Sequence, residues 1–191
     1  MKKTIIIGCL LLTFLSCKAQ ILPIENVIDY IEMEDTGIPE NIVYIKDINN
    51  LLDKYVGTWI GTYNNKTYEF IITKITEDLF GTLEDKLEIR YKVTDANGNI
   101  IEDTTSLTGD SPYIIKGNYL ARADFYVLSY IGQEANCGQQ GDLFIAVGYN
   151  NDNNTMKASL QVIGDLILAS ECPNGEAEQI LPTEQFTLTK Q

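Results

Sequence analysis

The sequence predicts an all-β fold, either an antiparallel up-and-down barrel or a sandwich of about nine strands, with a short helix near the N-terminus. From Thr58 onward, apolar and polar residues alternate with period two, the spacing of a strand with one buried face. Short polar turns separate these stretches, and no long helical tract lies between them. Helices between strands would have indicated a parallel sheet, so we expect antiparallel neighbours.

The beginning of the chain has the pattern of an export signal. Two lysines precede an apolar run, and the stretch ends in Leu15-Ser16-Cys17, which resembles a lipobox. The run is shorter than the roughly 20 residues that cross a bilayer as a helix. We therefore predict a lipoprotein signal peptide over residues 1–16, acylation at Cys17, and lipid anchoring of the exported chain in the cell envelope.

An ordinary signal peptide is the alternative. Lys18-Ala19-Gln20 would then end the signal, and cleavage after Gln20 would release a soluble secreted or periplasmic protein. Such a signal needs small residues at its last and third-last positions, whereas Ala19 lies between them. The lipoprotein interpretation is therefore favoured.

Residues 17–46 are predicted to be the acylated cysteine and an acidic tether, and residues 47–191 a single β-domain. Pro23 and Pro39 interrupt any long regular element in the tether. Four of its apolar residues have helical spacing, so that one helical turn can dock on the domain; they are Ile24, Val27, Ile28 and Ile31.

The domain is predicted to begin with a short helix over residues 47–56, which Asp47 caps at its start. A series of strands follows, with Asn97-Gly98 as a strong hairpin signal between two of them. The expected strands are 58–63, 68–72, 87–94, 100–104, 113–120, 125–131, 143–149, 156–162 and 185–189, with a short one at 166–169.

Two cysteines belong to the predicted domain. An exported protein meets an oxidising compartment, where a pair of cysteines commonly forms one disulfide. Cys137 and Cys172 lie far apart in sequence, unlike the Cys-x-x-Cys spacing of redox-active pairs. We therefore predict a structural disulfide between Cys137 and Cys172.

Composition argues against several classes of function. The chain contains no His and has a formal net charge of −13. Ser-His-Asp and Cys-His mechanisms and His-based metal sites are therefore excluded, and without a basic cluster we expect no nucleic-acid partner. The polar segments 95–99 and 150–154 are interpreted as turns and not as calcium loops. We expect no catalytic residue, no cofactor and no metal.

A carboxylate-based hydrolase is the weakest alternative. Glycoside hydrolysis needs two facing acids, and an acidic chain offers many such pairs by chance. The candidate acids are Glu69, Glu84, Glu88, Glu102 and Asp103.

Tyrosines recur within the predicted strands. If they face a common interior, their rings and hydroxyls suit a small hydrophobic ligand. The candidate cavity-lining residues are Tyr63, Tyr68, Tyr91 and Tyr126. The alternative is that they are ordinary residues of the sheet faces, half-buried as tyrosines commonly are.

The stretch from Leu51 to Trp59 resembles the opening of the calycin barrels, the lipocalin-like and fatty-acid-binding proteins. In that family a helical turn precedes a Gly-x-Trp motif, which Gly57-Thr58-Trp59 matches. The resemblance implies an up-and-down barrel in which Trp59 closes one end beneath a ligand cavity, stacked under an Arg of the last strand. This chain departs from the pattern, because residues 184–191 contain Lys190 and no Arg.

The chain also resembles the small uncharacterised lipoproteins of the Bacteroidota over most of its length. The similar segments are residues 16–20, 57–65 and 110–113. This resemblance implies no activity. Some of these lipoproteins carry an acidic run after the acylated cysteine as a surface-export tag, and its absence after Cys17 favours the periplasmic face.

These observations predict a lipid-anchored envelope protein that is not an enzyme. We expect it to bind a small hydrophobic ligand or an envelope protein, and to meet the membrane through its anchor only. The alternative is a structural or interaction lipoprotein with a filled core and no ligand.

Overall fold

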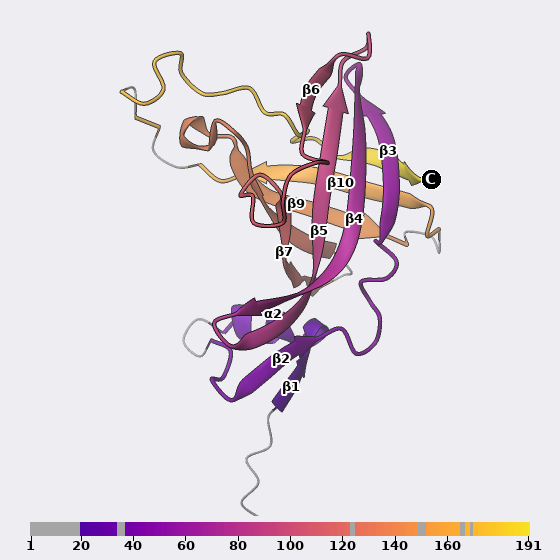
Figure 1. Cartoon of the computed structure of the whole chain (residues 1–191), viewed down its shortest axis with the longest axis vertical. Helices are drawn as coiled ribbons and strands as arrows, with labels where there is room; N and C mark the ends of the chain where they lie inside the picture. Colours follow the sequence, from indigo (N-terminus) through magenta and orange to yellow (C-terminus); the bar gives the residue numbers. More distant parts are fainter. Residues whose placement is uncertain (1–19, 34–36, 123–124, 149–151, 165–166, 169) are drawn as a thin grey trace, which may run out of the picture.

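The structure is a computed structural model that describes residues 20–33, 37–122, 125–148, 152–164, 167–168 and 170–191. Its strands form one sheet, of which eight close an antiparallel barrel, and three more lie outside the barrel (Figure 1). Each barrel strand pairs with the next one along the chain, and the last pairs with the first. The predicted up-and-down barrel is therefore confirmed.

The barrel strands agree closely with the alternating stretches of the sequence. They are β3 (Gly57–Tyr63), β4 (Lys66–Leu79), β5 (Thr82–Thr94), β7 (Ile115–Leu120), β8 (Phe125–Ile131), β9 (Gln140–Val147), β10 (Thr155–Val162) and β11 (Phe186–Lys190). The predicted strand at 166–169 lies partly outside the described residues, and residues 167–168 are not in a strand. β6 (Ile100–Asp103) pairs with the end of β5 beyond the barrel.

The β4–β5 hairpin is much longer than the rest of the barrel. β4 has 14 residues and β5 has 13, and β5 pairs with its barrel neighbour β7 only at Glu88 and Ile89. The first residues of β5 and the last of β4 therefore project below the barrel (Figure 1). There β2 (Ile42–Lys46) pairs parallel with β5, and β1 (Gln20–Pro23) pairs parallel with β2.

The segment expected to be a tether is folded wherever the structure describes it. Besides β1 and β2 it contains a 3₁₀ turn, η2 (Ile24–Asn26), and a short helix, α2 (Val27–Ile31). Ile24, Val27 and Ile28 are buried, in agreement with the predicted docking of one helical turn. Of the acidic residues described in this segment, Glu32 and Glu40 are exposed, whereas Glu25 and Asp29 are partly buried.

The short helix therefore lies earlier in the chain than predicted. Residues 47–56 form successive turns in place of the helix expected there, with backbone bonds such as Tyr55 N–H to the Leu52 carbonyl at 3.1 Å. Asp47 still caps the segment, because its carboxylate accepts the Leu51 and Leu52 amides at 2.7 and 3.1 Å. Hydrogen bonds between residues three apart form tight turns, and such turns suit a short connection that leads directly into β3.

A single apolar core fills the barrel and continues into the extension. Its largest fully buried side chains include Tyr55, Trp59, Phe70, Tyr91 and Tyr130. The predicted disulfide is confirmed: Cys137 and Cys172 are bonded, with their Cα atoms 5.6 Å apart. It joins η4 (Ala135–Cys137) to the long connection between β10 and β11.

Candidate functional site

The Gly57-Thr58-Trp59 motif that suggested a calycin barrel lies at the start of β3. Trp59 is fully buried and donates its indole N–H to the Tyr55 carbonyl at 2.7 Å. Lys190 of β11 pairs with Trp59 across the closing seam and places its Nζ 5.2 Å from the centre of the indole ring. A lysine thus supplies the cation that the resemblance assigned to an Arg.

Gly57 supports the same arrangement. Its φ is +134°, and a Cβ there would lie 2.9 Å from Cε of Lys190. A side chain at this position would therefore compete with the lysine stem for the space beside Trp59.

The candidate cavity-lining tyrosines contribute to the core. Tyr68, Tyr91 and Tyr126 are at most 2% exposed, while Tyr63 is partly buried. The Tyr91 hydroxyl donates to Glu102 at 2.8 Å, and the Tyr126 hydroxyl accepts the Leu87 amide at 3.3 Å. Burial raises the pKa of Tyr68 to about 12 and also raises the pKa values of Tyr91 and Tyr126.

The rings form a connected column through the barrel. Phe186 lies 5.1 Å from Tyr68 and 6.2 Å from Phe70, measured between ring centres. Phe70 continues to Tyr91 at 6.4 Å, and Tyr91 to Tyr130 at 6.3 Å. Aromatic rings at these separations pack in contact. The interior along this column is therefore occupied by side chains.

Two of the tyrosines do border a hollow on the surface. Tyr63 and Tyr68 line an open depression of about 530 Å³ at the upper end of the barrel. Its other side is the connection before β11, which includes Glu178 and Gln179. Lys66 crosses the depression and binds Glu178 at 2.9 Å. Polar side chains therefore occupy much of its rim.

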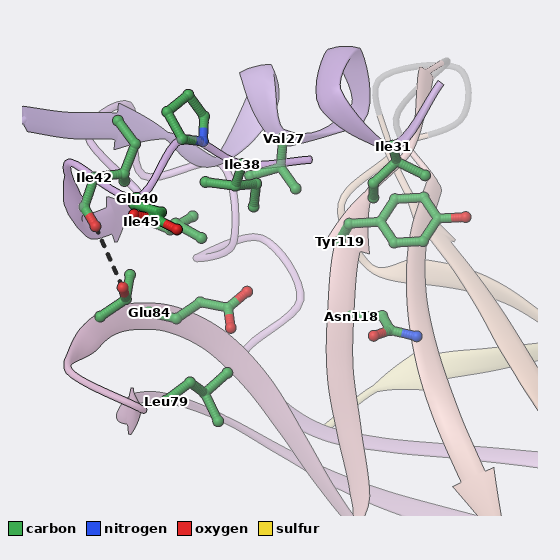
Figure 2. A pocket seen from close by; sticks show the side chains of 12 residues that line it. Val27, Ile31, Ile38, Glu40, Ile42, Ile45, Leu79, Glu84, Asn118 and Tyr119 are labelled. Atoms are coloured by element: carbon green, nitrogen blue, oxygen red, sulfur yellow. Dashed lines mark hydrogen bonds between the residues drawn. The ribbon is translucent and has the colours of Figure 1, made fainter. Parts of the chain in front are cut away.

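A second hollow, outside the barrel, is lined mainly by aliphatic side chains. This groove has a volume of about 390 Å³ and lies between α2, β2, the β4–β5 extension and β7 (Figure 2). Its apolar lining comes from α2, the loop after it, β2, β4 and β7, and comprises Val27, Ile31, Ile38, Pro39, Ile42, Ile45, Leu79 and Tyr119. The polar lining comprises Glu40, Thr82, Glu84 and Asn118.

The groove is shaped by local pairing. Thr82 donates its hydroxyl to the Ile42 carbonyl at 3.2 Å, which holds β2 against β5 at the groove edge (Figure 2). Ile45 pairs with Glu84 in the parallel β2–β5 ladder, so both side chains point to the same face of the extension. That face is the groove wall.

Charged side chains next to the groove form a balanced network around Glu84. Lys86, only 5% exposed, contacts Glu84 at 3.1 Å and Glu77 at 3.0 Å. Lys116 contacts Glu77 at 2.8 Å. Hydrogen bonds from Lys116 and then Lys86 hold the pKa of Glu77 below its ordinary value of 4.5. The two lysines compensate the two glutamates, so Glu84 can lie beside aliphatic groups.

Helix α2 is fixed over the groove from the outside. Arg122, which follows β7, donates to Asp29 at 2.8 Å and to Glu32 at 2.7 Å. An exposed ion pair contributes little alone, but a guanidinium held by two carboxylates restricts the position of the helix. Val27 and Ile31 of α2 then face Tyr119 across the groove.

The remaining candidate acids are engaged in structure. Glu102 is buried beside Tyr91, and Glu88 forms an ion pair with Arg90. Asp103 accepts from the Thr105 amide and hydroxyl, which lowers the pKa of its carboxyl. Glu69 pairs with Lys92 across the β4–β5 ladder. Among the described residues, no group of three or more acidic or cysteine side chains is arranged to hold a metal ion.

The polar segments resembling calcium loops are turns where described. Asp95 accepts the amides of Asn97 and Asn99, both at 2.8 Å. Asp152 accepts the Asn154 amide at 2.9 Å. These carboxylates are used to close the turns, as the sequence interpretation expected.

Cys17 and the predicted signal peptide lie outside the described residues. Across the described part of the chain, no helix is long and apolar enough to cross a membrane. A disulfide between Cys137 and Cys172 fits an exported protein.

Fold and site together define a small up-and-down β-barrel protein with a buried Trp59 at the seam between its first and last strands and an apolar groove outside the barrel. The chain belongs to a family of unknown function (DUF6705), which it matches over residues 1–191. Comparison with curated proteins and with solved structures finds no match.

The sequence interpretation did not find the groove. Its lining residues come from α2, the following loop, β2, the β4–β5 tip and β7, which are distant in sequence. The only local signal was the helical spacing of Val27 and Ile31, which indicated docking and not a site.

Proposed function

We propose that this protein is a lipid-anchored, non-enzymatic binding protein of the cell envelope, and that its ligand occupies the groove outside the barrel. The observation that carries the proposal is an aliphatic groove of about 390 Å³ beside a barrel whose axis is filled with aromatic rings. Apolar pockets of this size with few polar groups are typical small-molecule sites.

The charges at the groove define the class of ligand. Glu40 and Glu84 both belong to its lining, and no Lys or Arg does among the residues that the structure describes. Lys86 compensates Glu84, is not among the described lining residues and is only 5% exposed, so it is poorly placed to receive an anionic group from the groove. An uncharged or cationic apolar ligand is therefore favoured over a fatty acid carboxylate.

Two fluorescent probes of similar aromatic structure test this. N-phenyl-1-naphthylamine is uncharged, and 8-anilinonaphthalene-1-sulfonate carries a sulfonate. We expect the uncharged probe to bind about tenfold or more tightly than the anionic one, because the sulfonate would lie close to Glu84. Equal affinity for the two probes would contradict the assigned ligand class.

A matched pair of variants locates the binding site. Ile31 and Ile163 are both 48% exposed, but only Ile31 lines the groove. Ile31→Asp should weaken binding of the uncharged probe about tenfold, whereas Ile163→Asp should leave it unchanged. The proposal fails if the two variants bind the probe alike.

The anchor and the native ligand need separate measurements. Cys17→Ser should abolish incorporation of labelled palmitate, and undiminished labelling would refute acylation at Cys17.

Native mass spectrometry of protein purified from its own membrane should show one small molecule, which is lost in Ile31→Asp and retained in Ile163→Asp.

An interaction protein without a small ligand is the second candidate. The packed apolar core favours this second candidate, because a barrel without an internal ligand would act only as a scaffold for a binding surface. In that case the groove would receive an apolar side chain of an envelope protein. Native mass spectrometry would then detect no small molecule, and Ile31→Asp would weaken crosslinking to the partner.

A further inference from the structure

The tip of the β4–β5 hairpin carries an aromatic residue in an unfavourable position. Phe80 lies in the turn between the two strands, has a φ of +54°, and is fully exposed. Turns of this kind favour Asn, Asp or Gly, because a bulky side chain is strained at positive φ. Exposure and backbone strain together mark the tip as a surface with a function outside the fold.

Four further exposed apolar side chains lie on the strands next to Phe80, on both faces of the extension: Leu79 lines the groove, whereas the strand register turns Leu83 to the opposite face. Each lies at or next to the end of a strand at the same edge of the extension: Ile21 in β1, Val43 in β2, Leu83 in β5 and Leu79 in β4. All are exposed, with fractions from 39% for Leu79 to 52% for Ile21. We call Ile21, Val43, Leu79, Phe80 and Leu83 the apex surface.

The described chain begins at this same edge. β1, β2 and β5 are parallel, so all three start together. Gln20 is paired with Ile42, and Thr82 bonds to the Ile42 carbonyl at 3.2 Å. With neighbouring strands about 4.8 Å apart, Gln20 lies about 10 Å from the first residue of β5.

The predicted anchor is therefore close to the tip. Cys17 precedes Gln20 by three residues, which span at most about 11 Å. Acyl chains on Cys17 would bring the bilayer within about 20 Å of Phe80. The tether predicted to separate anchor and domain is folded from Gln20 onward wherever it is described, so little chain remains to hold the domain away.

We propose that the apex surface lies against the lipid surface, with Phe80 inserted between the headgroups. The membrane contact would then involve the folded protein as well as the anchor. This goes beyond the groove, because it does not require a ligand there. A second copy of the chain is a poorer occupant, since a net charge of −13 opposes self-association.

The charge also defines the lipid surface. A strongly acidic protein is repelled by anionic headgroups, so uncharged zwitterionic lipid is the expected contact. The partner is thus a zwitterionic bilayer, recognised through its apolar interface.

Tryptophan scanning tests the proposal on the full chain bound to phosphatidylcholine vesicles. Phe80→Trp reports on the apex, and Ile100→Trp is the matched control, because Ile100 is 60% exposed in β6 at the opposite end (Figure 1). The native Trp59 is fully buried and contributes the same signal to both variants. We expect blue-shifted emission and quenching by brominated phosphatidylcholine for Phe80→Trp only.

The unanchored Cys17→Ser chain separates the apex from the acyl chains. In excess phosphatidylcholine its partitioning should fall about tenfold on Phe80→Asp and remain unchanged on Ile100→Asp. Absence of quenching at Phe80→Trp in both the anchored and the unanchored chain would overturn the proposal, and so would equal quenching at both positions. A dimer with blue-shifted Phe80→Trp emission in the absence of vesicles would assign the apex to a second copy and also overturn it.

Discussion

Closure of the barrel depends on a glycine at the seam between its first and last strands. A Cβ added to Gly61 of β3 would lie 2.2 Å from the Thr187 carbonyl oxygen and 3.1 Å from Leu188 Cα. Both contacts are with backbone of β11, which cannot rotate away as a side chain can. Gly61→Ala should therefore force β3 and β11 apart at the pairing that closes the barrel.

The sign of the effect follows from two opposing terms. Replacing a strand glycine by alanine restricts the unfolded chain and stabilises by about 0.4–1 kcal/mol. Overpacking against the fixed backbone costs about 1–3 kcal/mol. Because the clash distance is far below van der Waals contact, we expect the second to dominate, with a net loss of about 1–2 kcal/mol.

Urea unfolding measures this directly. The single tryptophan, Trp59, is fully buried and pairs with Lys190 at the same seam, so its fluorescence reports the local structure while circular dichroism reports the whole sheet. Gly164→Ala is the control, because nothing lies within 4 Å of a Cβ there. It should leave stability unchanged or raise it by up to about 1 kcal/mol, because only the effect on the unfolded chain remains. A Gly61→Ala protein as stable as the wild type, with an unchanged denaturant slope, would refute the seam geometry.

Three further predictions concern the disulfide, the Trp59 contact and acid stability. Replacing Cys137 and Cys172 together by Ala should lower the free energy of unfolding by about 3–4 kcal/mol in the chain-entropy account while leaving the sheet folded at low urea; an unchanged urea midpoint would contradict a structural role. Lys190→Met should cost about 1 kcal/mol by removing the cation from the Trp59 ring, whereas Lys190→Arg should retain that contribution; equal stability of the two variants in urea would count against the cation–π contact. Lys116 and Lys86 hold the pKa of Glu77 below 4.5, so this group contributes stability that is present above the unfolded-state pKa and is lost as pH falls through the lower folded-state value. Glu77→Gln should therefore flatten the stability profile below about pH 4.5, measured by urea unfolding at several pH values, and an unaltered profile would exclude this group as the cause.

The barrel was predictable because its pattern is local. Alternation such as Tyr68, Phe70 and Ile72 identifies the buried face of a strand without reference to its neighbours. The Asn97-Gly98 turn likewise follows from local chemistry, since Gly98 takes a φ of +83°. The Cys137–Cys172 bridge required only the count of cysteines and the export signal.

The extension was missed for the opposite reason. Its strands extend through Glu77, Asp78, Glu84 and Asp85, beyond the predicted strands 68–72 and 87–94, and the acidic segment before residue 47 was predicted to be a tether. Buried partners reverse that interpretation: Lys86 compensates Glu77 and Glu84, and the Asp85 carboxylate accepts from the Tyr44 hydroxyl at 2.8 Å. These pairs join residues up to 41 positions apart, which no local pattern reveals.

By itself, the sequence determined the alternating strands, their antiparallel order, the disulfide and the absence of histidine chemistry. Each of these features depends on residue type and on residues close by in the sequence, because turn formation and the burial of one strand face are local effects. Only the tertiary structure decided that tyrosines fill the barrel, that Lys190 covers Trp59, and that a groove and an exposed Phe80 lie beside the start of the described chain. Those features arise from contacts between distant segments, and such contacts depend on how the sheet closes and where its longest hairpin projects.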